Sequence, residues 1–503
     1  MKAFVGVDVG TTGVKASLFS LEGRLLGQAL VPSTLHHPSP GLTEQDPKEM
    51  LEETLAAVRK AVDQAGPVSI QALALDGQMA GLMGIDQDWE ATTHYDSWLD
   101  TRCGDQVAAM NRHQEEVIRF SGSAPGFFFG PKLLWWKEVE PEVYARTAKF
   151  IQPAAFIAGK LAGLNGDQAY MDQTYIHFTN LSDNKNETWA KELLDLFEVD
   201  GAKLPRIISP TEVIGVLARP WAEKTGLPSG LPIAAGCGDT AAGLLGAGLV
   251  IPGEAVDTAG TASVLTFCSD EFRPDDQSRT LLSCRSVIDG LWYSLAYING
   301  GGLCIDWFAR ELGGEGGKGS LEELEQAAAE LPVGSEGLTF CPHFAGRNFP
   351  YQPDLRGSWT GLTWNHKPVH LLRSILEGIA LEYRHYLEAF KALYPDLETR
   401  GLRIIGGGAS SDLFCRIKAD CLGLKSATLE EREFGTLGSA LVAAAAVGQV
   451  DDLAGLVQEL TRERKVYQPR PREVEAYDQL FKEYRITIDG LIDIFRQRSG
   501  LAP

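Results

Sequence analysis

The sequence predicts an α/β protein of two similar halves. The first observation is a repeat: the segment VDVGTTG at 7–13 is followed half a chain later by VDTAGTA at 256–262. Each segment joins two short apolar runs, which predicts a strand, a tight turn and a second strand. The second observation is the glycine loop at 406–408, which directly follows an apolar strand. Such a loop at the start of a helix is typical of phosphate binding.

Length and charge narrow the class of protein. The chain has 503 residues, and one domain usually takes roughly 100–200 residues, so two large domains are expected. Lys and Arg number 46 against 67 Asp and Glu, which gives a net charge of −21. This charge repels nucleic acids and anionic membranes, so we expect neither as a partner. ATP still fits, because glycine-loop dipoles and Mg²⁺ bind its phosphates locally.

The cysteines and the N-terminus favour a cytoplasmic protein. The eight cysteines form no C-x-x-C pair, and several lie in apolar runs, so we expect them to be reduced and mostly buried. Asp8 interrupts the first apolar stretch, which is not typical of a signal peptide. The longest run of small apolar residues, at 440–447, is too short to cross a bilayer.

The elements of the first half follow from its hydrophobic periodicity. Leu51, Leu55, Val58 and Val62 recur at helical spacing, which predicts an amphipathic helix over 46–65. Apolar runs predict strands at 3–9, 14–19 and 25–32 and a buried strand at 68–75. The remaining expectations are helices over 104–121 and 131–147, an edge strand at 213–216 and a strand at 231–235.

The second half repeats the alternation of strands and helices. Strand pairs are expected near 255–267 and 291–298, and a short buried strand at 402–405. Periodic apolar positions predict a long amphipathic helix over 368–393 and a closing helix over 473–496. Further helices are expected over 321–331, 409–422 and 435–447.

The two hairpin turns are the first candidate site. Gly10, Thr11 and Thr12 in one turn, and Gly260 and Thr261 in the other, offer backbone N–H groups and hydroxyls to an anion. Asp8 ends the strand before the first turn, where a carboxylate is able to hold Mg²⁺ directly or through water. One such hairpin alone is more often an ordinary glycine turn, but the second copy favours the phosphate interpretation.

Asp239 is the second candidate. It lies in GCGDTAAG at 236–243, where a strand ends in glycines and a closely packed helix begins. A carboxylate at a helix N-terminus is a good cap, and this interpretation stands beside the functional one. The functional interpretation is a general base that accepts a proton from an attacking hydroxyl.

The glycine loop continues as GGGASSD at 406–412 and predicts a phosphate cradle at a helix N-terminus. It contains neither the G-K-[ST] of a P-loop nor G-x-G-x-x-G, so an ordinary strand-to-helix turn remains the alternative. The histidines show no H-E-x-x-H spacing, and the sequence contains no G-x-S-x-G.

Two polar segments of the first half are candidates for sugar binding. Asp76, Gln78 and Met79 follow one strand, and Trp98 precedes Asp100 and Arg102 in the second segment. Carboxamides and carboxylates bond hydroxyl groups, and aromatic planes suit a sugar ring. For Asp100 and Arg102, a structural ion pair is an equally good interpretation.

Taken together, these motifs resemble the FGGY carbohydrate kinases, the family of xylulokinase, glycerol kinase and ribulokinase. The resemblance covers nearly the whole chain in order. Its most specific stretch is GSWTGL at 357–362 with HL at 370–371 and SILE at 374–377, which is similar to the C-terminal signature of the family. The other matching segments are 6–12, 78–79, 98–102, 132–135, 238–243, 260–261, 299–308, 406–409 and 435–440.

The resemblance implies two actin-like (ribonuclease H-like) domains, at 1–246 for the sugar and 247–503 for the nucleotide. It implies the cofactors ATP and Mg²⁺, a small-molecule sugar substrate and a cytoplasmic enzyme, and it allows a homodimer. Asp239 would be the catalytic base and Asp8 would position the metal. The residues implied for the nucleotide are Gly10, Thr11, Thr12, Gly260, Thr261, Gly302, Gly407, Gly408, Ala409 and Asp412. Those implied for the sugar are Asp76, Gln78, Met79, Trp98, Phe127 and Asp239.

The sequence departs from the family pattern at residues near the expected sugar pocket. Xylulokinases typically carry a histidine where this chain has Ala80, and an asparagine where it has Leu99. Asp76 replaces a small residue, Thr240 replaces an Asn or Gln, and Phe127–Phe129 occupy the loop that carries a sugar-contacting tyrosine in glycerol kinases. We therefore expect an altered sugar pocket, because polar-site selectivity is steep.

The sequence predicts an ATP-dependent kinase that acts on a terminal hydroxyl of a ketose or polyol, similar to a pentulose. Two alternatives keep the same fold: a nucleotide-switching ATPase of the actin and chaperone kind, and a catalytically weak sugar sensor. The signature at 357–377 and Asp239 disfavour the ATPase. The retention of Asp8, Thr12, Asp239 and the glycine loop disfavours the sensor.

Overall fold

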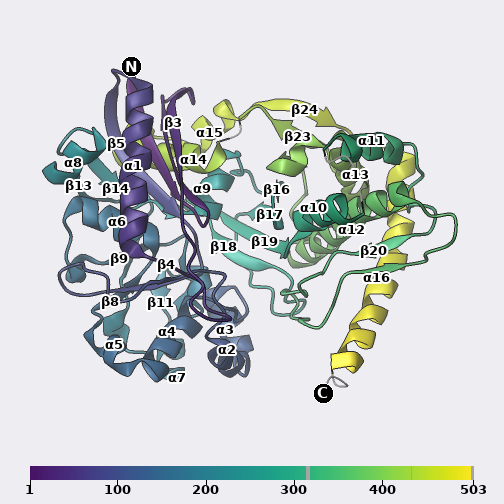
Figure 1. Cartoon of the computed structure of the whole chain (residues 1–503), viewed down its shortest axis with the longest axis horizontal. Coiled ribbons are helices and arrows are strands. Elements are labelled where there is room, and N and C mark those ends of the chain that lie inside the picture. Colours follow the sequence, from purple (N-terminus) through teal and green to yellow (C-terminus); the bar gives the residue numbers. More distant parts are fainter. Residues whose placement is uncertain (313–317, 432, 500–503) are drawn as a thin grey trace.

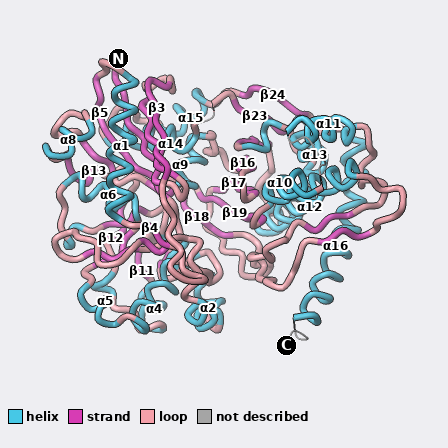
Figure 2. The backbone as a smooth tube through the Cα atoms, in the orientation of Figure 1, coloured by secondary structure: helices cyan, strands magenta, loops and turns pink. Residues whose placement is uncertain are grey.

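Two mixed β-sheets, each covered by helices, organise the chain into two α/β halves (Figure 1). The computed structural model describes residues 1–312, 318–431 and 433–499. The first sheet lies on the left in Figure 1 and the second on the right. Figure 2 shows the same arrangement by type of element, with helices around both groups of strands. This confirms the predicted fold class.

The first sheet has the strand order β13-β14-β5-β1-β2-β3, with β15 also paired to β5. Its strands are β1 (Lys2–Val9), β2 (Gly13–Phe19), β3 (Leu25–Pro32), β5 (Ser69–Gly77), β13 (Val213–Val216), β14 (Pro232–Ala234) and β15 (Cys237–Gly238). The predicted strands of this half all appear, and β13 is the expected edge strand.

The second sheet has the order β18-β19-β17-β16-β22-β23-β24. Its strands are β16 (Glu254–Ala259), β17 (Ser263–Ser269), β18 (Leu282–Arg285), β19 (Trp292–Ile298), β22 (Gly401–Ile405), β23 (Ser426–Leu429) and β24 (Glu463–Tyr467). The sequence analysis missed β18, β23 and β24.

The predicted repeat is visible in the strand pairing. In the first sheet β1 pairs antiparallel with β2 and parallel with β5, and the parallel β14 follows. In the second sheet β16 pairs antiparallel with β17 and parallel with β22, and the parallel β23 follows. Each half therefore opens with a hairpin whose first strand lies at the centre of its sheet.

Strand pairing shows which residues of the two hairpins correspond in space. This correspondence differs by one residue from the alignment of the two sequence repeats. Val9 pairs with Val14 at the end of the first hairpin, whereas Ala259 pairs with Ser263 at the end of the second. The structural counterpart of Asp8 is therefore Thr258. Asp257 lies one residue earlier and faces the opposite side of the sheet, because a shift of one residue reverses the face. There the buried Asp257 forms an ion pair with the buried Lys418.

Helices of the first half follow the prediction with two interruptions. The helix over 104–121 is divided into α2 (Gly104–Asn111) and α3 (Gln114–Ser121), and the helix over 131–147 into α4 (Phe129–Val139) and α5 (Pro141–Arg146). Pro141 has no N–H to continue α4, so it begins the next helix. The other helices are α1 (Pro47–Ala65), α6 (Pro153–Ala162), α7 (Lys191–Leu196), α8 (Arg219–Thr225) and α9 (Asp239–Gly246).

Helices of the second half include the long α12 (Pro368–Leu393), as predicted, and the C-terminal α16 (Pro471–Ser499). The others are α10 (Gly301–Glu311), α11 (Lys318–Ala329), α13 (Asp412–Leu422), α14 (Phe434–Ala446) and α15 (Leu453–Leu460).

Short strands pair outside the main sheets, namely β4 (Glu44–Gln45) with β7 (Tyr95–Asp96), β6 (Met83–Ile85) with β8 (Lys149–Ile151), β9 (Tyr170–Asp172) with β12 (Arg206–Ile208), β10 (Ser182–Asp183) with β11 (Thr188–Trp189), and β20 (Thr339–Cys341) with β21 (Ser358–Thr360).

Helix α14 belongs to the second half of the sequence but packs on the first sheet. Figure 1 shows it beside the strands of the first half, and its core residues join those of β1 and β5. Glycines allow this close approach: a Cβ on Gly6 would lie 1.9 Å from the carbonyl oxygen of Thr436, and a Cβ on Gly438 would lie 2.0 Å from that of Ala242. The chain thus connects its two halves through α9 and α14.

Strand β18 connects the halves on another side. The Ser283 amide donates to the carbonyl of Gly122 over 2.8 Å, and the Asn184 side chain donates to the Ser283 carbonyl over 2.9 Å. Arg285 donates to the carbonyls of Asn184 and Lys185, each over 2.8 Å. These bonds join β18 to the segments around α3 and β10.

The remaining expectations about the whole chain concern cysteines and membranes. All eight cysteines are buried and free, as predicted. Among the described residues, every helix is too short or too polar to span a bilayer. The boundary between domains at 246 and 247 stays a prediction.

Candidate active site

The buried Asp76 and the half-buried Asp8 and Asp239 meet where β1, β5 and β15 end. Asp8 pairs with Asp76 across the parallel strands β1 and β5, and Gly238, which precedes Asp239, pairs with Gly77. The parallel ladder therefore aligns the carboxyl ends of these strands at one edge of the sheet. Burial raises the pKa of Asp8 to about 6 and that of Asp239 to about 7.

Burial and the neighbouring charge of Asp8 raise the pKa of Asp76 well above its ordinary value. Burial raises the pKa of Asp8 less, so Asp76 is the member of the pair that binds a proton more readily. Ser439 of α14 donates a hydrogen bond to Oδ2 of Asp76. Asp76 is fully buried beside Asp8, and its contact with a sugar stays a prediction.

Asp239 is the first residue of α9. Its Oδ1 accepts the backbone N–H of Thr240 over 2.6 Å and the Thr240 hydroxyl over 3.2 Å, so one carboxylate oxygen is held in place. Burial is the main cause of its raised pKa, and the negative charge of Asp8 adds to it. A pKa near neutrality suits a general base. The N-cap of α9 is Gly238, and the helix has no side-chain cap bond, so Asp239 does not cap it. Its role as a base stays a prediction.

The chemistry of these residues fits Mg²⁺ held together with phosphates. Among the described residues, no cluster of three or more His, Cys, Asp or Glu side chains is arranged to hold a metal ion alone. Mg²⁺ is usually bound through one or two carboxylates, water and substrate phosphates, so a protein cage is not required. The buried oxygen Oδ1 of Asp76 has no hydrogen-bond donor, and the site carries unbalanced negative charge.

The second hairpin tip and the glycine loop line one cavity of about 610 Å³. Among the residues predicted for the nucleotide, Gly260, Thr261, Gly302, Gly407 and Gly408 all line it. A Cβ on Gly302 would lie 2.1 Å from the carbonyl oxygen of Gly260, so only glycine allows α10 to begin against the tip. Gly406 turns the chain at the end of β22 with φ of 81°.

Two residues predicted for the nucleotide have other positions. Ala409 belongs to the same short helical turn but is not among the lining residues of this cavity. Asp412 lines a neighbouring cavity of about 700 Å³ instead. Its carboxylate forms an ion pair with Lys465 and accepts the Tyr467 hydroxyl over 2.6 Å, which lowers its pKa.

The first hairpin tip lies beside the predicted sugar segments. The Trp98 indole N–H donates to Oγ1 of Thr11 over 2.9 Å, and the Thr11 hydroxyl donates to Oε1 of Gln78 over 3.2 Å. Trp98 is exposed and Thr12 is exposed at the tip, whereas Gln78 and Met79 are buried. Thr11, Gln78 and Trp98 are therefore brought together.

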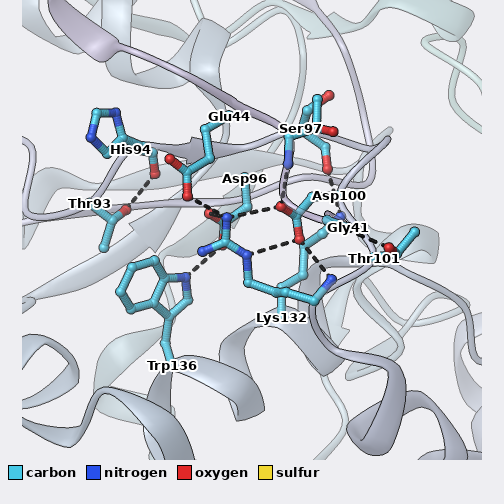
Figure 3. Close-up of polar contacts among 12 residues, drawn as sticks. Gly41, Glu44, Thr93, His94, Asp96, Ser97, Asp100, Thr101, Lys132 and Trp136 are labelled. Atoms are coloured by element: carbon cyan, nitrogen blue, oxygen red, sulfur yellow. Dashed lines mark hydrogen bonds and ion pairs between the residues drawn. The ribbon is translucent and has the colours of Figure 1, made fainter. Parts of the chain in front are cut away.

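Asp100 and Arg102 form a buried ionic network (Figure 3). The Arg102 guanidinium lies 2.5 Å from Glu44, 2.9 Å from Asp100 and 3.3 Å from Asp96. Trp136 donates its indole N–H to Asp96 over 2.6 Å. Burial raises the pKa of Asp96 to about 7. Asp100 and Arg102 are thus the structural ion pair of the second interpretation.

Lys132 joins three segments around the loop at 78–82, which follows β5. This loop is called the sugar loop because its Gln78 and Met79 are candidates for sugar binding. The fully buried ammonium of Lys132 donates to the carbonyls of Phe127 over 2.6 Å, Ser97 over 2.9 Å and Ala80 over 3.4 Å. Burial lowers the pKa of Lys132. Phe127 is half-buried, and its carbonyl is part of this clamp. The resemblance indicated Lys132 through its motif, but only the structure shows its contacts.

Ala80 occupies an unusual backbone position. Its φ is 66°, in the left-handed region that favours glycine and, among other residues, Asn, Asp and His. Its methyl group joins an apolar cluster with Phe128 of the first half and Phe349 of the second. The sugar loop therefore presents an apolar surface where xylulokinases typically carry histidine.

Gln45 and Ser439 are site residues that the sequence analysis missed. Gln45 is buried in the two-residue strand β4 and bonds Gln78, while Ser439 reaches Asp76 from α14. The polar dipeptide Glu44–Gln45 before a predicted helix was an available signal for the first. Nothing local in the sequence indicates the second, because it depends on the packing of α14.

Comparisons with known proteins support the carbohydrate kinase interpretation. The pattern described as "FGGY family of carbohydrate kinases, N-terminal domain" matches residues 3–246, and its C-terminal counterpart matches residues 256–447. The xylulose kinase of Bacillus subtilis is 27% identical over 495 residues, with 96% of each chain covered. The gluconokinase of the same organism is 25% identical, covering 98% of this chain and 95% of its own.

A solved structure shows the same architecture over the whole chain. The ligand-bound xylulose kinase of Lactobacillus acidophilus superimposes with a TM-score of 0.91 at 25% identity. The match covers 99% of this chain and 100% of the other. The arrangement of the two halves is thus that of a known kinase structure.

Proposed function

Because the chain belongs to the FGGY family of carbohydrate kinases, we propose that it transfers the γ-phosphoryl group of ATP to a terminal hydroxyl of a ketose or polyol, similar to a pentulose. The single observation that carries this proposal is the position of Asp239. Its carboxylate is half-buried, is oriented by Thr240 and has a pKa raised to about 7, and it lies at the sheet edge beside Asp8.

The reaction needs one base and two sets of phosphate contacts. Asp239 accepts the proton of the attacking hydroxyl, the hydroxyl oxygen forms a bond to the γ-phosphorus, and the bond from that phosphorus to the bridging oxygen breaks to release ADP. The turn at Gly10–Thr12 and the turn at Gly260–Thr261 offer backbone N–H groups to the phosphates. Most of the rate enhancement comes from positioning and charge neutralisation.

Asp8 would hold Mg²⁺ together with ATP, and the metal would neutralise negative charge on the phosphates. Gly260, Thr261, Gly302, Gly407 and Gly408 support the nucleotide assignment, since they share one cavity. The raised pKa of Asp76 favours its neutral form, which limits the negative charge at the sheet edge. Free buried cysteines are consistent with action in the cytoplasm. A homodimer stays a prediction.

The acceptor is expected to lie between Gln78, Met79, Trp98 and Asp239. Known relatives include kinases of xylulose and of gluconate, so the family name does not specify one acceptor. The apolar methyl group of Ala80 replaces a hydrogen-bonding histidine of xylulokinases. A site that lacks one such partner selects a different arrangement of hydroxyl groups.

The test is release of ADP from Mg·ATP with a panel of ketoses, polyols, aldoses and sugar acids, each against a blank without acceptor. We expect strong turnover with one or two compounds and a product heavier by one phosphoryl group. Slow hydrolysis that no compound accelerates would contradict a sugar kinase and would favour a nucleotide-switching ATPase.

A further inference from the structure

The hydroxyl of Thr11 at the first hairpin tip faces the sugar loop rather than a phosphate. A hydroxyl has one proton to donate and two lone pairs. Its proton goes to Oε1 of Gln78 over 3.2 Å, and one lone pair accepts the indole N–H of Trp98 over 2.9 Å. A phosphate oxygen needs a donor, and this hydroxyl has no proton left to offer. Only the backbone of Thr11 is available to an anion.

A closed ring of hydrogen bonds fixes these directions. The Thr11 carbonyl only accepts, so the Gln45 amide presents Nε2 to it, at 3.4 Å. Gln45 must then offer Oε1 to Nε2 of Gln78, at 2.5 Å, which leaves Oε1 of Gln78 for the Thr11 hydroxyl. Each donor and acceptor in the ring is therefore determined by the one before it.

The ring joins two parts of the cleft that bind different substrates. The Thr11 backbone forms the turn after β1, while Gln78 follows β5 and Trp98 follows β7. Gln45 is 1% exposed and fixed by pairing of β4 with β7, so the ring rests on a rigid support. A molecule that contacts Gln78 or Trp98 bears directly on the turn that holds phosphate.

We propose that Thr11 is a positioning residue that couples occupancy of the sugar site to the phosphate-binding turn. The inference rests on the proposed function, because it needs an acceptor at Gln78 and Trp98 and ATP at the turn. An acceptor that contacts Gln78 or Trp98 stabilises the ring in this arrangement and with it the turn, so the acceptor and the nucleotide bind more tightly together than apart. Coupling of this kind is reciprocal between the two sites.

The experiment measures the dissociation constant of Mg·AMP-PNP by calorimetry, with and without saturating acceptor. The acceptor is the panel compound with the highest kcat/KM. We expect the acceptor to tighten AMP-PNP binding to the wild type by about fivefold or more, within the usual range of coupling. Thr11→Val keeps the β-branched shape without the hydroxyl, and its coupling factor should fall below about twofold. Thr11→Ser keeps the hydroxyl and should retain the coupling.

Two further measurements separate this role from others. A loss of AMP-PNP affinity in Thr11→Val that is equally large with and without acceptor would make the hydroxyl a phosphate ligand and overturn the inference. Gln45→Met removes another member of the ring and should also lose the coupling, which keeps the inference testable if Thr11→Val fails to fold.

The outcomes distinguish the inference from the proposed function. Full coupling in Thr11→Val, or no coupling in a wild type that phosphorylates the acceptor, overturns the inference alone. A wild type that phosphorylates no compound of the panel contradicts the proposed function, and the inference with it.

Discussion

Single residues at the sheet edge combine burial with charge, and Asp239 shows the consequence most clearly. Burial raises its pKa to about 7 in the folded protein, against an ordinary value of 3.8. Between these values the folded state binds more protons than the unfolded state, so the contribution of Asp239 to stability falls as pH rises. Above about pH 7 the folded protein bears the full free-energy cost of the ionised Asp239 carboxylate. An uncharged side chain at this position avoids that cost.

We therefore expect Asp239→Asn to be more stable than the wild type without nucleotide or metal, with a gain that grows from pH 5 to pH 8. The growth should be on the order of 1–2 kcal/mol. Thermal unfolding at several pH values measures this gain in stability. The control is Asp63→Asn, because the Asp63 side chain on α1 is exposed. A difference that stays constant with pH would show that Asp239 is ionised at no cost.

Ala80 tests specificity at the same scale. Its left-handed backbone accepts histidine more readily than most side chains, so Ala80→His is compatible with the loop. If this loop selects the acceptor, Ala80→His should raise the kcat/KM for xylulose relative to the best wild-type acceptor by about tenfold. Ala80→Gly relieves the backbone strain without adding a donor and serves as the control. An unchanged order of acceptors in Ala80→His would exclude this loop as the selector.

At the scale of elements, close packing of helices against the first sheet holds the two halves together. Gly438 lets α14 approach α9, and a Cβ there would lie 2.0 Å from the Ala242 carbonyl oxygen. Gly438→Ala should therefore lower the free energy of unfolding by at least about 1–3 kcal/mol, because backbone has to move.

The matched control for this change is Gly490→Ala, in the exposed part of α16, where a Cβ meets open space. This substitution should stabilise by about 0.5–1 kcal/mol, since alanine favours helix. Comparison of the two variants by denaturant unfolding separates packing from helix propensity. Equal effects of the two substitutions would contradict close contact between α9 and α14.

The start of α10 gives a prediction about the nucleotide cavity. Alanine at Gly302 would place its Cβ 2.1 Å from the Gly260 carbonyl oxygen and displace the hairpin tip. Gly302→Ala should weaken Mg·AMP-PNP binding by about tenfold or more, equal to about 1.4 kcal/mol. Gly104→Ala at the start of α2, where a Cβ meets open space, should leave binding unchanged. Normal binding in Gly302→Ala would remove this tip from the nucleotide site.

At the scale of the whole molecule, the sequence predicted what depends on local pattern and repetition. Hydrophobic periodicity located β1, β2, β5 and the long α12, and the recurrence of the Gly-Thr turn predicted two similar halves. The order of motifs indicated the family. The cavity that gathers Gly260, Gly302 and Gly407 was anticipated from the same motifs.

Features that depend on contacts between distant segments escaped the sequence analysis. The apolar, small-residue pattern of α14 predicts a buried helix but not which sheet it covers. The ion pair that holds Asp257 on the other side of its sheet depends on Lys418, which is 161 residues away in sequence. The direction of the Thr11 hydroxyl depends on Gln45, which is 34 residues away in sequence. Local propensity carries no information on such partners.

The measurement that tests the central claim most directly compares Asp239→Asn with the wild type in phosphorylation of the best acceptor and in binding of Mg·AMP-PNP. We expect kcat to fall by about 10²–10⁴-fold, the usual contribution of a general base, while AMP-PNP binding remains near that of the wild type. Retained turnover in Asp239→Asn would contradict its role as the base and with it the proposed mechanism.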